Sequence, residues 1–244
     1  MTSTTEFLLN DRLVEADAPA GELVLDYLRR EERLVGTKEG CKEGDCGACA
    51  IMVGELDDEG SIDYELVTSC LIPLGEMQGK HVVTIEGMNV GEGLNPVQQA
   101  MCDFGGTQCG FCTPGFVVSM VWYMMCGEGE PTLDGFQRAI GGNLCRCTGY
   151  ASINRASESL IERFREGGEW AEIWRADDRI AALADAGMIP SYLPDAPEKL
   201  VAHEVPLAVV DALEAVEIDH QKRHGVPAPD ALQLLVDALD EVPA

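Results

Sequence analysis

Eight of the ten cysteines in this 244-residue chain fall into two groups whose spacing suits metal binding. The first group is a C-x4-C-x2-C run made of Cys41, Cys46 and Cys49, followed by the more distant Cys70. This is the plant-type spacing of a [2Fe–2S] cluster. Zinc ribbons normally use two closely spaced pairs, so three thiolates on one glycine-rich loop suit zinc poorly. We therefore predict an iron–sulfur cluster at this site.

The second group joins a C-x2-C pair, Cys109 and Cys112, to a C-x-C pair, Cys145 and Cys147. Spacing alone leaves this site open to either zinc or iron and sulfide. Cys112 directly precedes Thr113-Pro114, which predicts the start of a helix. The positive end of a helix stabilises an anionic cluster, which favours iron over zinc.

Other side chains offer less chemistry. Cys102 and Cys126 lie among apolar neighbours on predicted helices, so we expect buried structural thiols. Met120, Met124 and Met125 are expected in the core. The sequence contains neither a G-x-G-x-x-G fingerprint nor a phosphate-binding loop, and no activated nucleophile is evident. We therefore expect no catalytic residue on this chain.

The formal net charge is −26 at neutral pH. Such a surface repels nucleic acids and anionic membranes, so neither is expected as a partner. Both a basic partner surface and a high-salt cytoplasm would be compatible with this negative charge. The N-terminus, Met1 to Asn10, has no basic region followed by an apolar core, so we expect a cytoplasmic protein. In that reducing compartment, clustered cysteines are metal ligands rather than disulfides.

Short strands and one helix are predicted over residues 1–90. Asn10-Asp11 is the signal of a two-residue hairpin turn, and one helix should cross a small mixed sheet. The expected helix is Glu22–Glu32, and the expected strands are Thr4–Leu9, Arg12–Ala16, Cys49–Glu55, Ile62–Ser69 and His81–Glu86.

Four short helices are predicted over residues 91–168, and they should form a small bundle. Asparagine or threonine followed by proline marks the start of two of them. Their expected ranges are Pro96–Phe104, Pro114–Cys126, Thr132–Ile140 and Ser152–Glu166.

The composition changes after residue 168. Residues 169–244 contain 16 acidic and 5 basic side chains. Weak helices are predicted near Ala176–Ala186, Leu207–His220 and Ala228–Leu239. Because this extension has little chance of an independent core, we expect it to pack along partner subunits, the alternative being a disordered solubilising tail.

Three motifs carry a family resemblance. Residues 39–49 read EGCKEGDCGAC, residues 108–115 read QCGFCTPG, and residues 142–150 read GNLCRCTGY. In this order they resemble the iron–sulfur subunit or domain of the molybdenum hydroxylases, the xanthine dehydrogenase and aldehyde oxidase family. The resemblance covers about residues 4–166 and favours iron–sulfur at the second site. It implies an α+β protein, with a β-grasp [2Fe–2S] ferredoxin domain, a four-helix [2Fe–2S]-binding domain and then the acidic helical tail.

The resemblance also implies an electron route and partners. Substrate reduces a molybdopterin centre in a large subunit, and electrons pass through the helical-domain cluster and the ferredoxin cluster to FAD. About 75 residues follow the helical domain, too few for a flavin domain, so FAD should lie on a separate subunit of a higher-order hetero-oligomer. Gln108 and Cys147 are expected to approach the pterin. The implied ligands are Cys109, Cys112, Cys145 and Cys147 for the helical-domain cluster, and Cys41, Cys46, Cys49 and Cys70 for the ferredoxin cluster.

Within that family, the stretches 43–45 and 110–117 look more like those of xanthine dehydrogenases than those of carbon monoxide dehydrogenases. We therefore predict an electron-transfer subunit of an oxidoreductase of the xanthine or purine dehydrogenase type. One alternative is the corresponding subunit of an aldehyde or carbon monoxide dehydrogenase. A free-standing ferredoxin-like shuttle is another, although a shuttle needs only one cluster domain. A zinc-bound adaptor without redox activity is the third.

Overall fold

The computed structural model describes residues 4–57, 61–89, 93–167, 169–176, 178–190 and 193–202. All of them belong to one unit, Met1–Val205. The helices expected at Leu207–His220 and Ala228–Leu239 lie outside the described residues.

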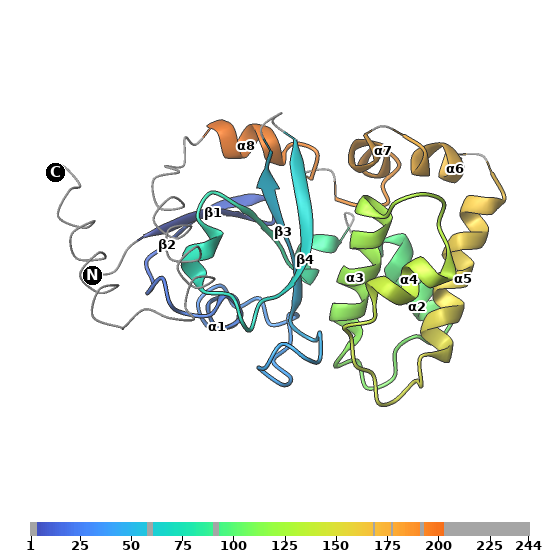
Figure 1. Cartoon of the computed structure of the whole chain (residues 1–244), viewed down its shortest axis with the longest axis horizontal. Coiled ribbons are helices and arrows are strands. Elements are labelled where there is room, and N and C mark those ends of the chain that lie inside the picture. Colours follow the sequence, from blue (N-terminus) through green and yellow to red (C-terminus); the bar gives the residue numbers. More distant parts are fainter. Residues whose placement is uncertain are drawn as a thin grey trace, which may run out of the picture. The chain divides into compact units, whose positions relative to one another are not determined.

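The first part of the chain forms a five-stranded mixed sheet (Figure 1). The strand order is β2-β1-β5-β3-β4, with β1 and β5 parallel and the other pairs antiparallel. Asn10 has φ of 53° at the turn that pairs Leu9 with Arg12, which confirms the predicted hairpin. The strands are β1 (Thr5–Leu9), β2 (Arg12–Ala16), β3 (Ala50–Leu56), β4 (Ile62–Thr68) and β5 (His81–Val83).

One helix, α1 (Val24–Arg30), crosses this sheet as predicted. Its apolar side chains Val24 and Leu28 pack with Phe7 and Ile51 of the strands, and all four are fully buried. The cysteine-bearing loop follows this helix and leads into β3. The first cysteine group therefore lies between a helix and a strand of this small core.

The last predicted strand is shorter than expected. It ends at Val83 rather than Glu86, and a 3-10 helix follows over Ile85–Met88. The Thr84 N–H donates to the side chain of Asn10, and the Glu86 carboxylate accepts from the Thr84 hydroxyl. One of these side-chain bonds is local and the other reaches a residue 74 positions away. They take the place of the strand ladder, which the apolar pattern could not show.

His81 is fully buried within the sheet. Its Nε2 donates to the Asn10 carbonyl at 2.8 Å, and its Nδ1 accepts from the Tyr64 hydroxyl at 2.7 Å. Burial lowers the pKa of His81 from 6.5 to about 4, so the folded protein holds a neutral imidazole.

This burial predicts acid sensitivity. Because the folded pKa lies below the unfolded value, the contribution of His81 is present above pH 6.5 and is lost progressively as pH falls toward about 4. The loss should reach about 3 kcal/mol. Unfolding by denaturant between pH 7 and pH 4 should show a shallower pH dependence for His81→Gln than for the parent. If the stability of the two proteins depends equally on pH, the contribution assigned to His81 is contradicted.

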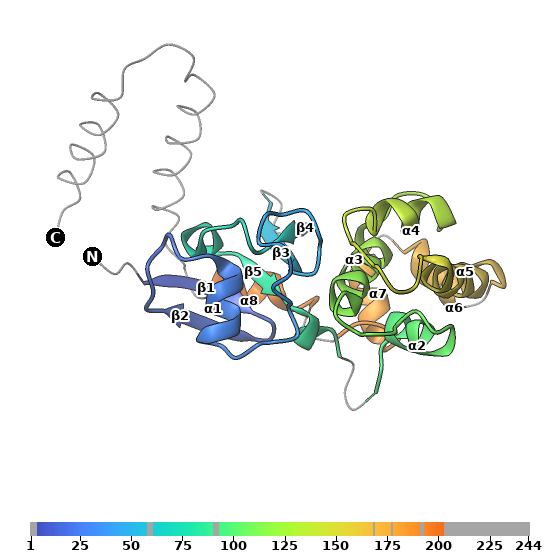
Figure 2. The same cartoon turned by 90° about the horizontal axis from the view of Figure 1, so that it is seen from below.

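The second part of the chain forms a group of four helices (Figure 2). Asn95 caps the first of them with a reciprocal capping box, and a fully buried set of apolar side chains fills the centre. Met120, Met124 and Met125 belong to that core, as predicted. The helices are α2 (Pro96–Asp103), α3 (Thr113–Cys126), α4 (Leu133–Ala139) and α5 (Ala151–Arg165).

Cys102 and Cys126 differ from expectation. Cys102 is exposed, because the inward face of α2 consists of Val97, Ala100 and Met101 and the next residue points outward. Cys126 is partly buried at the end of α3, and burial raises its pKa to about 11. Neither thiol belongs to the two cysteine groups.

Helix α3 lies alongside β3 and β4, so the helical part packs directly on the sheet (Figure 1). The Trp122 indole N–H donates to the Tyr64 carbonyl of β4 at 2.7 Å. Tyr64 and Met52 of the sheet share one apolar cluster with the α3 side chains. The two cysteine-bearing parts therefore meet through a packed interface rather than a loose linker.

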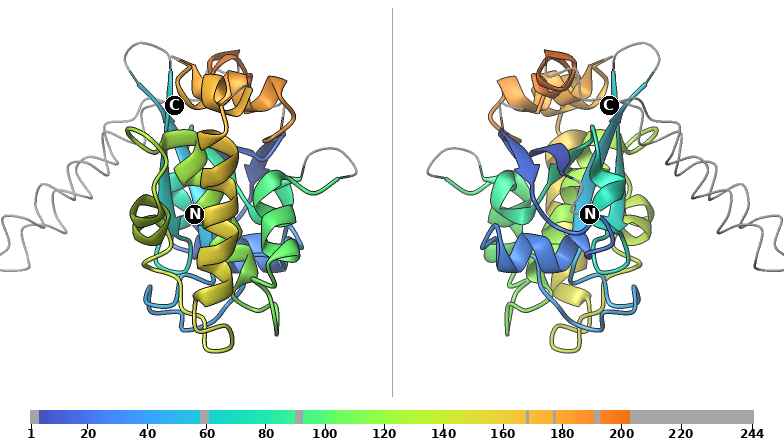
Figure 3. Two further views of the ribbon diagram at one scale, coloured as in Figure 1. Left: turned by 90° about the vertical axis from the view of Figure 1, so that its right-hand side faces the viewer. Right: turned by 90° about the vertical axis from the view of Figure 1, so that its left-hand side faces the viewer.

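The extension continues this packing. Helices α6 (Glu169–Trp174) and α7 (Arg179–Asp185) place Trp174 and Leu183 in the helical core, and α8 (Ala196–Ala202) packs on β1 (Figure 3). We expected the extension to pack along partner subunits. Through α8 that expectation is wrong, because the apolar side chains are buried on this chain's own domains.

Within the described ranges, no helix is long and apolar enough to cross a membrane.

Candidate iron–sulfur centres

The first cysteine group lies on the loop between α1 and β3 and just after β4. Its four thiols form two interacting pairs, Cys41 with Cys46 and Cys49 with Cys70. Within the loop, the Cys41 N–H points at the Cys46 sulfur at 3.4 Å, and the Glu43 N–H points at the Cys41 sulfur at 3.3 Å. The loop therefore already directs backbone donors toward sulfur, as an anionic cluster requires.

Burial divides this group into an inner and an outer pair. Cys49 and Cys70 are buried, whereas Cys41 and Cys46 are half-buried. The Glu43 N–H bond lowers the pKa of Cys41 to about 7, and burial raises the pKa of Cys49 to about 12. Iron binds cysteine in its thiolate form. Bound iron would therefore stabilise the negative charge on the Cys49 sulfur, which burial disfavours when no iron is bound.

The second group lies around the N-terminus of α3, with Cys112 directly before the helix, as predicted. It also forms two pairs, Cys109 with Cys147 and Cys112 with Cys145. Burial raises the pKa of Cys112 to about 12. Burial also acts against ionisation of Cys145, but hydrogen bonds from Thr148 outweigh it and lower the pKa of that thiol.

The pairing favours a two-iron cluster at both sites. In a [2Fe–2S] cluster held by four cysteines, each iron takes two thiolates, so the protein must offer two separate pairs. A structural zinc ion instead needs four ligands converging on one point. Each group offers four neighbouring thiols, which fit the ligand set of a [2Fe–2S] cluster.

The outer face of the second site is open. Cys109 and Cys147 are exposed, and so is Gln108, which directly precedes Cys109. Phe111 and Leu144, both large and apolar, are also about half-exposed, on the side of the second site that meets the first cysteine loop at Gly40 and Cys46. Another protein surface could therefore approach this face closely.

The sequence did not point to Asn143, although it lies within the GNLCRCTGY motif. Its side chain donates to the Gly47 carbonyl of the first cysteine loop at 3.0 Å. The next residue, Leu144, donates its backbone N–H to the Cys46 carbonyl, also at 3.0 Å. The two cysteine loops are thus hydrogen-bonded to each other, which no spacing rule could reveal.

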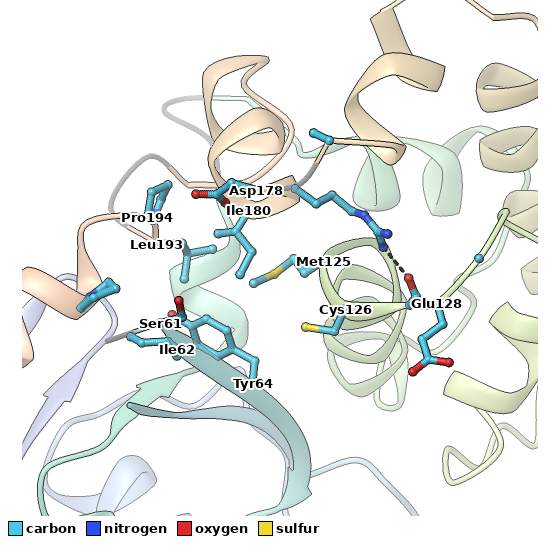
Figure 4. A pocket seen from close by; sticks show the side chains of 15 residues that line it. Ser61, Ile62, Tyr64, Met125, Cys126, Glu128, Asp178, Ile180, Leu193 and Pro194 are labelled. Carbon is cyan, nitrogen blue, oxygen red and sulfur yellow. Dashed lines mark hydrogen bonds between the residues drawn. The ribbon is translucent and has the colours of Figure 1, made fainter. Parts of the chain in front are cut away.

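A cavity of about 720 Å³ lies apart from the cysteine groups (Figure 4). Tyr64 of β4, Met125 and Cys126 of α3 and Ile180 of α7 line it, and Arg179 donates to the Gly127 carbonyl at its edge. None of its lining residues is one of the eight predicted ligands. It is therefore separate from the two cysteine groups.

Two families of domains match the chain. Residues 7–75 match the 2Fe-2S iron-sulfur cluster binding domain, and residues 84–158 match a second [2Fe-2S] binding domain. Together with the paired thiols, these matches define the class of the protein: it contains two [2Fe–2S]-binding domains, a ferredoxin domain followed by a helical one.

Individual relatives define it further. Xanthine dehydrogenase of Blastobotrys adeninivorans is 41% identical over 162 residues, which is 65% of this chain and 12% of that protein. Aldehyde oxidase 1 of Oryctolagus cuniculus is 44% identical over 159 residues, 64% of this chain and 12% of that protein. The chain thus spans about an eighth of the length of these curated relatives.

A solved structure extends the comparison. Quinoline 2-oxidoreductase from Pseudomonas putida 86 includes a chain that is 32% identical, with a TM-score of 0.54. The match covers 68% of this chain and 97% of that one. The protein described here belongs to the molybdenum hydroxylase family as its iron–sulfur part. Two [2Fe–2S]-binding domains in one chain support an electron-transfer role.

Proposed function

We propose that this chain is the electron-transfer subunit of a heteromeric molybdenum hydroxylase. Its two domains, a β-grasp ferredoxin domain and a four-helix domain, would each hold one [2Fe–2S] cluster. When bound, such clusters accept and release one electron at a time. Electrons would enter from a molybdopterin subunit at the helical domain and leave from the ferredoxin domain to FAD on another subunit.

The observation that carries this proposal is the gathering of eight cysteines into two groups of four interacting thiols, one group in each domain. Two groups of four supply the terminal ligands of two two-iron clusters with none left over. The hydrogen-bonded seam between the two loops supports direct transfer between the sites. The ligand assignments are Cys41, Cys46, Cys49 and Cys70 for one cluster and Cys109, Cys112, Cys145 and Cys147 for the other.

The similarity does not separate xanthine dehydrogenases from aldehyde oxidases, since the two kinds of relative match this chain at 41% and 44% identity. We favour a purine dehydrogenase over a carbon monoxide dehydrogenase because of the 43–45 and 110–117 stretches, and an aldehyde dehydrogenase is the alternative. Metal and flavin analysis of the native complex purified through this chain tests the proposal. Stoichiometric molybdenum and FAD are expected, and their absence from an intact native complex would refute it.

Gln108 should matter at the molybdenum side. It is exposed beside Cys109, and the family resemblance places it near the pterin. Gln108→Ala should leave the iron content of the chain unchanged, because the side chain is not a cluster ligand. Substrate should reduce the helical-domain cluster roughly tenfold more slowly in the reconstituted complex, the loss expected for one polar contact to a cofactor. Rapid-mixing absorbance measurements would follow that step.

Gln137→Ala is the matched control for this experiment. Gln137 is an exposed glutamine on α4, away from the cysteines in sequence. It should leave the reduction rate unchanged. If Gln108→Ala also reduces as fast as the parent, the assignment of this face to the molybdenum subunit is wrong.

A further inference from the structure

Asn143 lies at the point where the two cysteine loops meet. It is 3% exposed, and its side-chain N–H donates to the Gly47 carbonyl at 3.0 Å. Its side-chain oxygen accepts from the Ser119 hydroxyl at 2.8 Å. Because the Gly47 carbonyl can only accept, these partners fix the orientation of the amide. The side chain therefore ties the loop of the first site to helix α3 of the second.

A backbone contact continues this seam. The Leu144 N–H donates to the carbonyl of Cys46 at 3.0 Å. Leu144 directly precedes Cys145, so a ligand of one site is linked to a ligand of the other through about ten covalent bonds and one hydrogen bond. The Asn143 side chain lies next to this backbone hydrogen bond. It therefore holds Leu144 in register with Cys46.

The loops touch too closely for side chains to separate them. Gly47 has φ of 65°, and a Cβ there would lie 2.5 Å from the Gly142 carbonyl oxygen. A Cβ on Gly115, in the first turn of α3, would lie 2.3 Å from the Gly47 carbonyl oxygen. Only glycine fits at both positions. The Gly47 carbonyl is therefore enclosed in this seam, where it accepts from the Asn143 side chain across the seam and from the Ala50 N–H within its own loop.

We propose that Asn143 is a positioning residue for electron transfer between the two cluster sites. Its amide holds the Cys46 loop against the Cys145 loop and so fixes their separation and electronic coupling. The inference rests on the proposed function. The step it serves moves one electron: the helical-domain site is oxidised, the ferredoxin site is reduced, and no bond or proton is exchanged.

Asn143→Ala tests this role in the full chain with both clusters in place. The substitution removes one of the two donors to the Gly47 carbonyl, which keeps the Ala50 N–H at 3.1 Å, and it frees the Ser119 hydroxyl to donate to the Gly115 carbonyl at 2.9 Å. Iron content should stay at the parental value. Hydrogen exchange of the Leu144 amide should become roughly tenfold faster. Magnetic coupling between the two reduced clusters should weaken, and electron transfer between them in the native complex should slow roughly tenfold.

Asn89→Ala is the control, because Asn89 is exposed and, among the residues that the structure describes, its side chain hydrogen-bonds only to Gln98. It should leave the iron content, the hydrogen exchange of the Leu144 amide, the magnetic coupling and the rate of electron transfer unchanged. If Asn143→Ala does not retain both clusters, Ser119→Ala, which removes the hydrogen bond that supports Asn143, should move the same quantities in the same direction by a smaller factor.

Parental cluster coupling and parental Leu144 exchange in either variant would overturn the proposal. A purely structural role in the helical domain would lower stability without changing the coupling between the sites. A parent chain that lacks two clusters would instead overturn the proposed function, so the two failures are distinguishable.

Discussion

Cys46→Ser should remove the ferredoxin cluster and spare the helical-domain cluster, because the two sets of thiols are separate. Iron should fall from about four to about two atoms per chain. The Cys46 backbone carbonyl that contacts Leu144 is retained, so the neighbouring loop should keep its conformation. In the complex, substrate should still reduce molybdenum and the remaining cluster, but electron flow to FAD should stall.

Cys102→Ser is the matched control, since Cys102 is an exposed thiol outside both groups. It should leave iron content and turnover at the parental level. Iron analysis and steady-state turnover with a flavin-linked acceptor would compare the two variants. Unaltered turnover in Cys46→Ser would show that the assumed route through the ferredoxin cluster is wrong.

Removing the extension after Gly167 should strongly destabilise the helical domain. The truncation deletes Trp174, Leu183 and Ile189, all buried against the helical core. Trp174 packs edge-on to Tyr123 and Phe164, with ring centroids 5.7 and 4.8 Å away. Losing several such side chains should lower the free energy of unfolding by more than about 5 kcal/mol. Thermal unfolding monitored at the second cluster would measure this effect.

A chain that ends after Ala202 provides the comparison, because it retains α6, α7 and α8. It should unfold near the parental temperature. Trp174→Ala should fall between the two truncations, with a loss of about 3–5 kcal/mol. Equal stability of the chains ending at 167 and at 202 would contradict the packing described here.

The sequence predicted the elements whose signals are local. The Asn10-Asp11 turn, the proline-capped helices and the apolar strands all lie close to their expected positions. The eight cysteines lie in two separate groups, as their spacing indicated. Their assignment as cluster ligands stays a prediction. Which protein surface Gln108 and Cys147 contact stays a prediction.

The features that escaped prediction depend on tertiary contacts. Asn143 is one polar residue in a glycine-rich turn, and its partner Gly47 lies 96 residues away. The extension has weak helical signals. The position in which it packs is determined by the apolar surface of the helical core that it covers. The neighbouring helices likewise determine which face of α2 is buried. That choice of face decides whether Cys102 is exposed.

The central claim is that this chain binds two [2Fe–2S] clusters with separate sets of four cysteines. Iron and acid-labile sulfide analysis of the full chain, combined with electron paramagnetic resonance of the reduced protein, tests it most directly. We predict about four iron and four sulfide per chain and two distinguishable paramagnetic centres. Stoichiometric zinc without visible absorption, or a single paramagnetic centre with about two iron per chain, would contradict this account.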